Sequence, residues 1–277
     1  MVAMRLAYAE TRRFQPSHMA PGAPLRSLTS TRSAVGLAGR LKPSPPRRPS
    51  SNLSRESRIG AGQGHGLELA LSPEQRLQCR KLMDSCGIRL AALGAAFRVG
   101  RDPVPQLDEL ADLAEALGAG HVRIFLDDQR EDERHADWVG RLAMAFAEIE
   151  DLAAASPGLL IVENQGSVAR CADLAKVLPE AIGLLWDVAY SLKAGESAAE
   201  SMTYLPRMTH VHLKDVRQQG AGWAASRLGE GMVDIDFILG RLRDADFPGV
   251  ISLETKSDDP DGDLGRLVRL STADTAA

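Results

Sequence analysis

Beyond about residue 66, the chain alternates short apolar runs with longer stretches in which apolar residues recur at helical spacing. This alternation predicts β-strands joined by amphipathic helices, which is the pattern of a parallel sheet. Seven runs qualify as strands, at residues 66–70, 88–93, 121–126, 158–163, 183–187, 209–214 and 249–254. We therefore expect repeated βα units over most of the chain.

Helix boundaries can be predicted at several points between these runs. The sequences SPEQ at 72–75 and SAAE at 197–200 are capping boxes, in which a serine and an acid or amide three residues later cap each other's backbone. In the first box a proline also occupies the first helical position. Gly87 and Gly118 stand where helices are expected to end, because glycine is favoured after the last helical turn.

Residues 11–64 differ in kind, since they are rich in Arg, Pro, Ser and Gly and carry no apolar period. Such a segment buries too little surface to offset the entropy of ordering it. We predict a basic segment at 1–64, either disordered, a transit peptide, or the product of a wrongly assigned gene start, followed by a barrel domain at 65–277. A short apolar run at 4–9 is the one candidate strand within the first segment.

The number of units fits two folds, an open doubly wound sheet or a (β/α)8 TIM barrel. No Gly-x-Gly-x-x-Gly follows a strand, so the dinucleotide-binding form of the open sheet lacks its usual signature. We predict the barrel, with its first βα unit absent or degenerate, because nothing before residue 66 offers an apolar helix.

Charge and composition exclude several classes of protein. The net charge of −4 hides a segment, residues 1–60, in which eleven Lys and Arg face two acids, so the remaining chain is strongly acidic. A strongly acidic domain binds a phosphate backbone poorly, and we expect no nucleic-acid partner.

No apolar run approaches the ~20 residues that span a bilayer. Three cysteines without a disulfide or zinc spacing favour a cytoplasmic protein in which they are small buried residues.

The late strands end on residues that bind metals: Glu163, Asp187, His212 and Glu254. In a parallel barrel the carboxyl ends of all strands open on one face, where active sites of this fold lie. One acid at a strand end is commonly a helix cap, but four such residues in consecutive units indicate a common site. Three carboxylates repel one another unless a cation lies between them. Oxygen and nitrogen ligands in this ratio suit Mn²⁺, Mg²⁺, Co²⁺ or Zn²⁺.

These strand ends lie in five short motifs: VENQG at 162–166, GLLWDV at 183–188, HVHLKD at 210–215, LGEG at 228–231 and SLE at 252–254. In their order and spacing they resemble the sugar phosphate isomerase/epimerase family, the xylose isomerase-like TIM barrels of the AP endonuclease 2 superfamily. The resemblance covers about residues 66–256.

The resemblance implies a role for each residue. Glu163, Asp187, His212 and Glu254 would bind one divalent metal ion, with Glu163 and Glu254 also acting as the catalytic acid and base. Arg123 and Lys214 match positions that commonly face substrate in such barrels. The implied activity is isomerisation or epimerisation of a small sugar or sugar phosphate through a metal-stabilised enediolate. Barrels of this kind often pair, so a homodimer is also expected.

Other functions stay open at this point. A dehydratase acting on a cyclic polyol or keto acid would use the same four ligands. The abasic-site endonucleases of the superfamily need further histidines, and here Tyr190 stands where that pattern has one. An inactive barrel relic is the remaining alternative, because the first unit is not recognisable. Phe97 and Trp223, in predicted loops, are candidates to stack on a sugar face.

Overall fold

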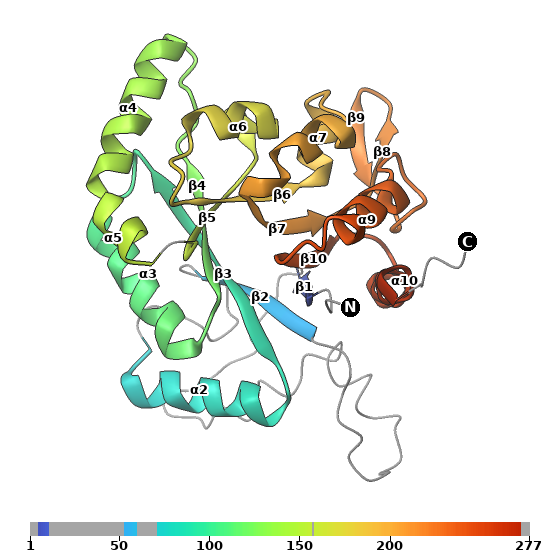
Figure 1. The fold of residues 1–277 in the computed structure, drawn as a ribbon, viewed down its shortest axis with the longest axis horizontal. Helices are drawn as coiled ribbons and strands as arrows, with labels where there is room; N and C mark the ends of the chain where they lie inside the picture. The colour runs from blue at the N-terminus through green and yellow to red at the C-terminus, as the bar shows by residue number, and fades with distance from the viewer. Residues whose placement is uncertain (1–4, 11–52, 60–70, 157, 273–277) are drawn as a thin grey trace.

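A closed barrel of parallel strands forms the centre of the computed structural model, which describes residues 5–10, 53–59, 71–156 and 158–272 (Figure 1). Its strands are β1 (Arg5–Glu10), β2 (Leu53–Ile59), β3 (Arg89–Val99), β4 (His121–Leu126), β5 (Leu160–Glu163), β6 (Gly183–Asp187), β7 (Met208–Leu213) and β10 (Val250–Thr255). They follow one another around the barrel in chain order, and β10 closes it by pairing with β1. The predicted TIM barrel is thereby confirmed.

Most predicted strands are found close to their expected positions. The strands at 121–126 and 183–187 have the predicted bounds, and the others in the described chain begin within two residues of prediction. β3 is longer than predicted, since it continues to Val99 after a shift of register against β4. The predicted strand at 66–70 lies outside the described residues.

The N-terminal segment contributes two strands to the barrel, which corrects the boundary predicted at residue 64. β1 pairs with β10 on one side and with β2 on the other, so both strands complete the sheet. β1 falls on the apolar run at 4–9, the one candidate strand predicted in this segment, and the part of the first βα unit that follows it lies outside the described residues. β2, with the sequence LSRESRI, has charged residues at three of seven positions, and this is why no apolar run marks it.

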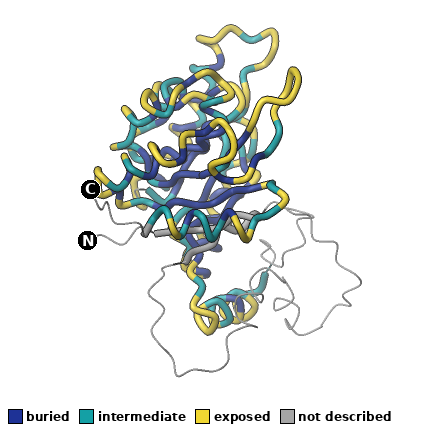
Figure 2. The backbone as a smooth tube through the Cα atoms, turned by 90° about the vertical axis from the view of Figure 1, so that its right-hand side faces the viewer, coloured by how far each residue is buried: buried dark blue, intermediate teal, exposed yellow. Residues whose placement is uncertain are grey.

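Helices cover the outside of the barrel, and buried residues concentrate on the strands (Figure 2). They are α2 (Pro73–Ser85), α3 (Val104–Leu117), α4 (His135–Glu148), α5 (Glu150–Ala155), α6 (Cys171–Val177), α7 (Val188–Lys193), α8 (Ala198–Ser201), α9 (Ile235–Asp244) and α10 (Pro260–Thr272), with 3-10 turns at Gly166–Val168 and Met202–Arg207. Both capping boxes are present, and Gly118 ends α3 in the left-handed conformation with φ 69°. Among the described helices, none is long and apolar enough to cross a membrane.

Alternation along the strands separates the barrel interior from the helix layer. Leu160 and Val162 pack into the large core under the helices, whereas Ile161 belongs to a separate cluster with Ala92 and Leu185. Because successive side chains of a strand point to opposite faces, the residue two positions after Ile161 also points inward. The middle of the barrel interior is therefore filled by apolar side chains such as Ile161, and the part near the carboxyl ends of the strands is lined by polar side chains.

A hairpin of β8 (Val216–Gln219) and β9 (Gly222–Ala225) extends from the carboxyl end of β7 (Figure 1). Trp223, one of two aromatic residues considered for sugar stacking, lies on β9 and is 38% exposed. Phe97 is 2% exposed within β3 and packs in the core, so its proposed role in a loop is wrong.

The three cysteines differ in how far they are buried, and this difference can be tested by their reactivity. Cys79 and Cys171 are buried, but Cys86 at the end of α2 is exposed, so the expectation of three buried cysteines is wrong for it. Burial raises the pKa of Cys79, and burial with the nearby charge of Glu196 raises the pKa of Cys171 to about 12. Because the thiolate is the reactive form, we expect Cys86 to react with Ellman's reagent at least about a hundredfold faster than Cys171.

The measurement is the rate of thiol release from native protein, compared between wild type and Cys86→Ser. The substitution should remove the fast phase and leave the slow phases intact. A fast phase that survives it would contradict the burial of Cys79 and Cys171.

Candidate metal centre

Four side chains of metal-binding type gather at the carboxyl ends of adjacent barrel strands: Glu163 on β5, Asp187 on β6, His212 on β7 and Glu254 on β10. Each offers one ligand atom, these atoms all lie within 4.8 Å of one another, and all four residues are buried. The structure thus brings together the four residues predicted as ligands. Strand topology explains the convergence, because consecutive parallel strands end at the same mouth.

The donor set fits a divalent ion. Ligand distances of about 2.0–2.2 Å place two donors to one ion at most about 4.4 Å apart, so the observed cluster needs only small adjustments. Three carboxylates with one imidazole are ligands for hard or borderline cations. Burial of three carboxylates at this spacing also requires nearby positive charge.

Asp187 is held in place by the helix that follows it. It is the N-cap of α7, and its Oδ1 atom accepts hydrogen bonds from the backbone N–H groups of Ala189 and Tyr190 at 2.9 and 3.1 Å. Its other oxygen accepts from Lys214 Nζ at 2.7 Å. Burial raises the pKa of Asp187, with the charges of Glu163 and Glu254 adding to this effect and Lys214 opposing it.

His212 lies between the two glutamates. Its Nδ1 atom is 3.4 Å from Glu163 Oε1 and 3.2 Å from Glu254 Oε2. Its ring meets that of His210 edge to face, with centroids 5.0 Å apart, and His210 Nε2 hydrogen-bonds to the hydroxyl of Ser252. His210 therefore belongs to the buried floor beneath the cluster, and it orients the ring above it.

Two cations adjoin the carboxylates, and both were predicted to face substrate. Arg123 Nη1 lies 3.4 Å from Glu163 Oε2, and its guanidinium sits over the ring of Phe125 at 4.3 Å. Lys214 Nζ lies 3.1 Å from Glu254 Oε2 in addition to its contact with Asp187. Burial alone would lower the pKa of Lys214, but Asp187 and Glu254 outweigh burial and raise it. Both cations thus partly neutralise the acidic cluster.

Asn164 is a buried residue of the site that the sequence motifs contained but did not assign. Its side-chain amide donates to the carbonyls of Ala169 and Asp187 and to the hydroxyl of Ser191. Its carbonyl oxygen accepts the backbone N–H of Asp187. The position directly after Glu163, in the VENQG motif, was the available signal for this role.

Asp215 plays a similar part for the loop that carries the LGEG motif. Its carboxylate is buried and accepts backbone N–H groups from Val216, Gly229, Gly231 and Val233, at 2.7–3.1 Å. Gly231 has no room for a side chain, because an added Cβ would lie 2.2 Å from an oxygen of Asp215. One carboxylate thus ties this loop to the end of β7.

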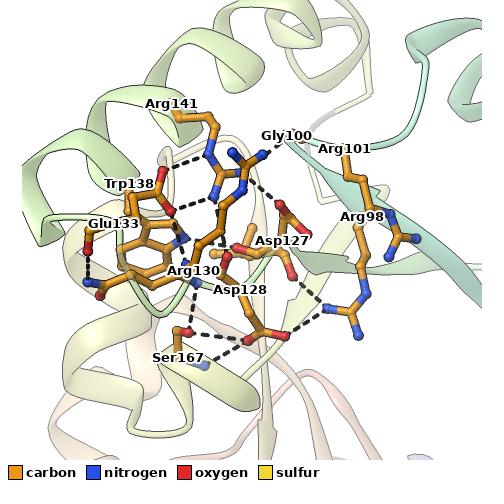
Figure 3. A network of polar contacts seen from close by, with 12 residues as sticks. Arg98, Gly100, Arg101, Asp127, Asp128, Arg130, Glu133, Trp138, Arg141 and Ser167 are labelled. Carbon is orange, nitrogen blue, oxygen red and sulfur yellow. Dashed lines mark hydrogen bonds and ion pairs between the residues drawn. The ribbon is translucent and has the colours of Figure 1, made fainter.

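The loop after β4 is fixed by a polar network centred on Arg141 of α4 (Figure 3). Arg141 forms ion pairs with Asp127 at 2.8 Å and with Glu133 at 2.9 Å, and its guanidinium also donates to the carbonyl of Gly100. The hydrogen bonds from Arg141 lower the pKa of Glu133 to about 2. This loop, residues 127–134, is therefore anchored to its own helix and to the end of β3.

Asp128 extends this network to the next strand. It pairs with Arg98 of β3 at 3.4 Å and accepts the backbone N–H of Ser167, in the turn after β5, at 2.9 Å (Figure 3). The mouth of the barrel therefore has a rigid rim on the side of β3 to β5.

Comparison with known proteins agrees with this architecture. Residues 59–272 match the family model described as xylose isomerase-like TIM barrel. The chain belongs to this family. No curated protein matches the chain significantly.

Several solved structures share the fold along four fifths or more of the chain. A D-tagatose 3-epimerase-like protein is 16% identical with a TM-score of 0.66, covering 96% of this chain and 97% of that one. The IolI protein, determined with a bound zinc atom, is 14% identical with a TM-score of 0.65, covering 97% and 98%. The probable 3-DHS dehydratase AsbF of Bacillus anthracis is 16% identical with a TM-score of 0.61, covering 80% and 89%. Identities this low establish the shared fold.

Proposed function

We propose that this xylose isomerase-like barrel is a metal-dependent isomerase or epimerase of a small sugar or sugar derivative. The observation that carries the proposal is the buried cluster of three carboxylates and one imidazole at the carboxyl ends of the strands. Structural neighbours described as epimerases support it, and the IolI protein, which was determined with a zinc atom, is a barrel of the same fold that binds a metal.

Glu163, Asp187, His212 and Glu254 would hold the ion, which would be Mn²⁺, Mg²⁺, Co²⁺ or Zn²⁺. Bound there, a divalent ion acidifies a carbon-bound proton beside a carbonyl and stabilises the negative charge that proton removal creates. Among the three carboxylates, those of Glu163 and Glu254 lie on the two strands that are furthest apart around the barrel, β5 and β10.

Glu163 and Glu254 are suited to move the proton. β6 and β7 lie between their strands, and an oxygen of each carboxylate lies within 3.4 Å of His212 Nδ1. A substrate carbon placed over the cluster would therefore have one carboxylate on each face. One glutamate removes the proton and the other returns it, which inverts the carbon. Return to the neighbouring carbon instead gives isomerisation.

Lys214 and Arg123 orient the glutamates in this scheme. Arg123 contacts Glu163, and Lys214 contacts Glu254, so each base has a cationic neighbour. Such a neighbour stabilises the carboxylate form that accepts a proton. Their predicted contact with substrate remains part of the proposal.

The test is metal content followed by solvent exchange. We expect purified wild-type protein to bind about one divalent ion per chain, and His212→Ala to weaken binding at least about a hundredfold, because it removes one ligand from the set. The loaded protein should then incorporate deuterium from solvent into a responsive ketose or keto-sugar derivative. His135→Ala, which changes an exposed histidine at the start of α4, is the matched control.

Absence of metal from folded wild type would overturn the proposal. Release of water from the substrate, without exchange of deuterium into the recovered substrate, would favour the dehydratase alternative. AsbF, described as a probable dehydratase, has the same fold. A cytoplasmic location, a homodimer and the absence of a nucleic-acid partner remain predictions from the sequence.

A further inference from the structure

A polar side chain lies directly beside each of the candidate ligands on β5 and β6. Asn164 follows Glu163 at the end of β5, and Trp186 precedes the ligand of β6, Asp187. The side-chain amide of Asn164 and the indole N–H of Trp186 both donate to the hydroxyl of Ser191, at 3.2 and 3.1 Å. One hydroxyl of α7 therefore accepts a hydrogen bond from the end of each of these two strands.

The hydroxyl of Ser191 can accept both bonds because its own proton is used elsewhere. It donates to Glu196 Oε2 at 2.8 Å, and both residues are 1% exposed. A carboxylate accepts hydrogen bonds and donates none, so this bond sets the direction of the hydroxyl proton and leaves the lone pairs of the oxygen free to accept. The carboxylate thus determines how Ser191 meets the strands.

The bond to Ser191 also determines which way the amide of Asn164 points. Its Nδ2 group faces Ser191 and the carbonyls of Ala169 and Asp187, so its Oδ1 atom accepts the backbone N–H of Asp187. A reversed amide would place an acceptor against two carbonyl oxygens. Asn164 therefore holds Asp187 by both of its backbone polar groups.

The backbone of Asp187 in turn sets the position of its carboxylate. The last residue pair between the two strands joins Glu163 to Leu185, and beyond it the side chain of Asn164 connects the end of β5 to Asp187. The carboxylate of Asp187 also caps α7, the helix that carries Ser191. A shift of this helix or of the amide would therefore move a candidate ligand atom.

We propose that Ser191 is a positioning residue for the metal ligands of β5 and β6, acting through Asn164 and Trp186. This inference rests on the proposed function and adds to it a residue outside the ligand set that controls how the ligands are placed. Loss of hydrogen bonds that orient ligands typically weakens metal binding about ten- to a hundredfold.

The experiment measures Co²⁺ affinity by competition with a chromophoric chelator, together with the visible absorption spectrum of the bound ion, which depends on ligand geometry. We expect Ser191→Ala to weaken Co²⁺ binding about tenfold and to change the spectrum. Trp186→Phe removes the indole donor and keeps an aromatic ring, and it should weaken binding several-fold. This second variant decides the matter if Ser191→Ala does not fold.

Ser201→Ala is the matched control. Ser201 is fully buried on α8 and donates to the same oxygen of Glu196 at 2.9 Å, but in the described chain it has no hydrogen bond to Asn164 or Trp186. Its loss should lower stability, measured by urea unfolding in the presence of chelator, about as much as the loss of the Ser191 hydroxyl. It should leave Co²⁺ affinity and the spectrum as in wild type.

A purely structural role of Ser191 predicts instead that metal affinity follows stability in both serine variants. If Ser201→Ala weakens binding as much as Ser191→Ala, or if the variants of Ser191 and Trp186 bind Co²⁺ as wild type does, the inference is overturned while the proposed function stands. A folded wild-type protein that takes up no metal overturns both.

Discussion

Glu254→Gln is expected to reduce solvent deuterium exchange at the substrate carbon by about a thousandfold, within the range that a positioned general acid or base contributes. Glutamine has nearly the same shape as glutamate but cannot accept the proton. The buried carboxylate lies 3.2 Å from His212 Nδ1 and 3.1 Å from Lys214 Nζ, so the amide would occupy a well-defined position. The measurement is the loss of the carbon-bound proton signal by NMR in D₂O, with metal content checked for each protein.

Glu163→Gln provides the complementary arm of this experiment. If the two glutamates act on opposite faces, each variant should lose proton removal from one epimer and keep slow exchange from the other. Glu180→Gln, at an exposed position after α6, is the control and should behave as wild type. Equal rates in wild type and in both site variants would contradict the assignment of these glutamates as the acid and base.

Glu196→Ala should lower the free energy of unfolding by about 3–5 kcal/mol, because several buried donors would lose their acceptor at a cost of about 1–3 kcal/mol each. Glu196 is 1% exposed, and its carboxylate accepts hydrogen bonds from the backbone of Cys171 and Ala172 and from the hydroxyls of Ser191 and Ser201. The substitution leaves these buried donors without an acceptor. It therefore loosens α6, α7 and α8 together.

The measurement is urea unfolding followed by circular dichroism. Glu180→Ala removes an exposed glutamate from the turn before β6 and should change the stability by less than about 0.5 kcal/mol. A loss below about 1 kcal/mol for Glu196→Ala would show that the network contributes little, because that is the value of a single ordinary hydrogen bond.

The sequence was sufficient to predict the barrel and the cluster, because both follow from the order of the apolar runs along the chain and from the residues at the end of each run. Buried parallel strands are mostly apolar, so β4 and β6 were recognisable with their correct bounds. Each candidate ligand lies at or near the carboxyl end of such a strand, and the closed topology then brings the four together. No knowledge of loops was needed for this step.

The remainder depends on contacts that leave no local pattern. β2 has the largely polar sequence LSRESRI, and its pairing with β1 and β3 is what makes it a strand. Glu196 precedes a capping box and has the sequence context of an exposed loop, yet it is buried at the junction of three helices. Phe97 was expected in a loop because the predicted strand ended at residue 93, whereas β3 continues to Val99.

The hydrogen bonds that Asp215 accepts from the loop at residues 228–233 also limit how often this loop can move away from the barrel. Lifting residues 228–233 away from β7 would break the hydrogen bonds from Gly229, Gly231 and Val233 to one buried carboxylate. At about 1–1.5 kcal/mol for each bond, the opened form would be populated by roughly one molecule in 150 to one in 2,000. The loop therefore stays attached to the end of β7 nearly all of the time, and the frequency of its opening depends on the hydrogen bonds that a single aspartate accepts from a glycine-rich turn.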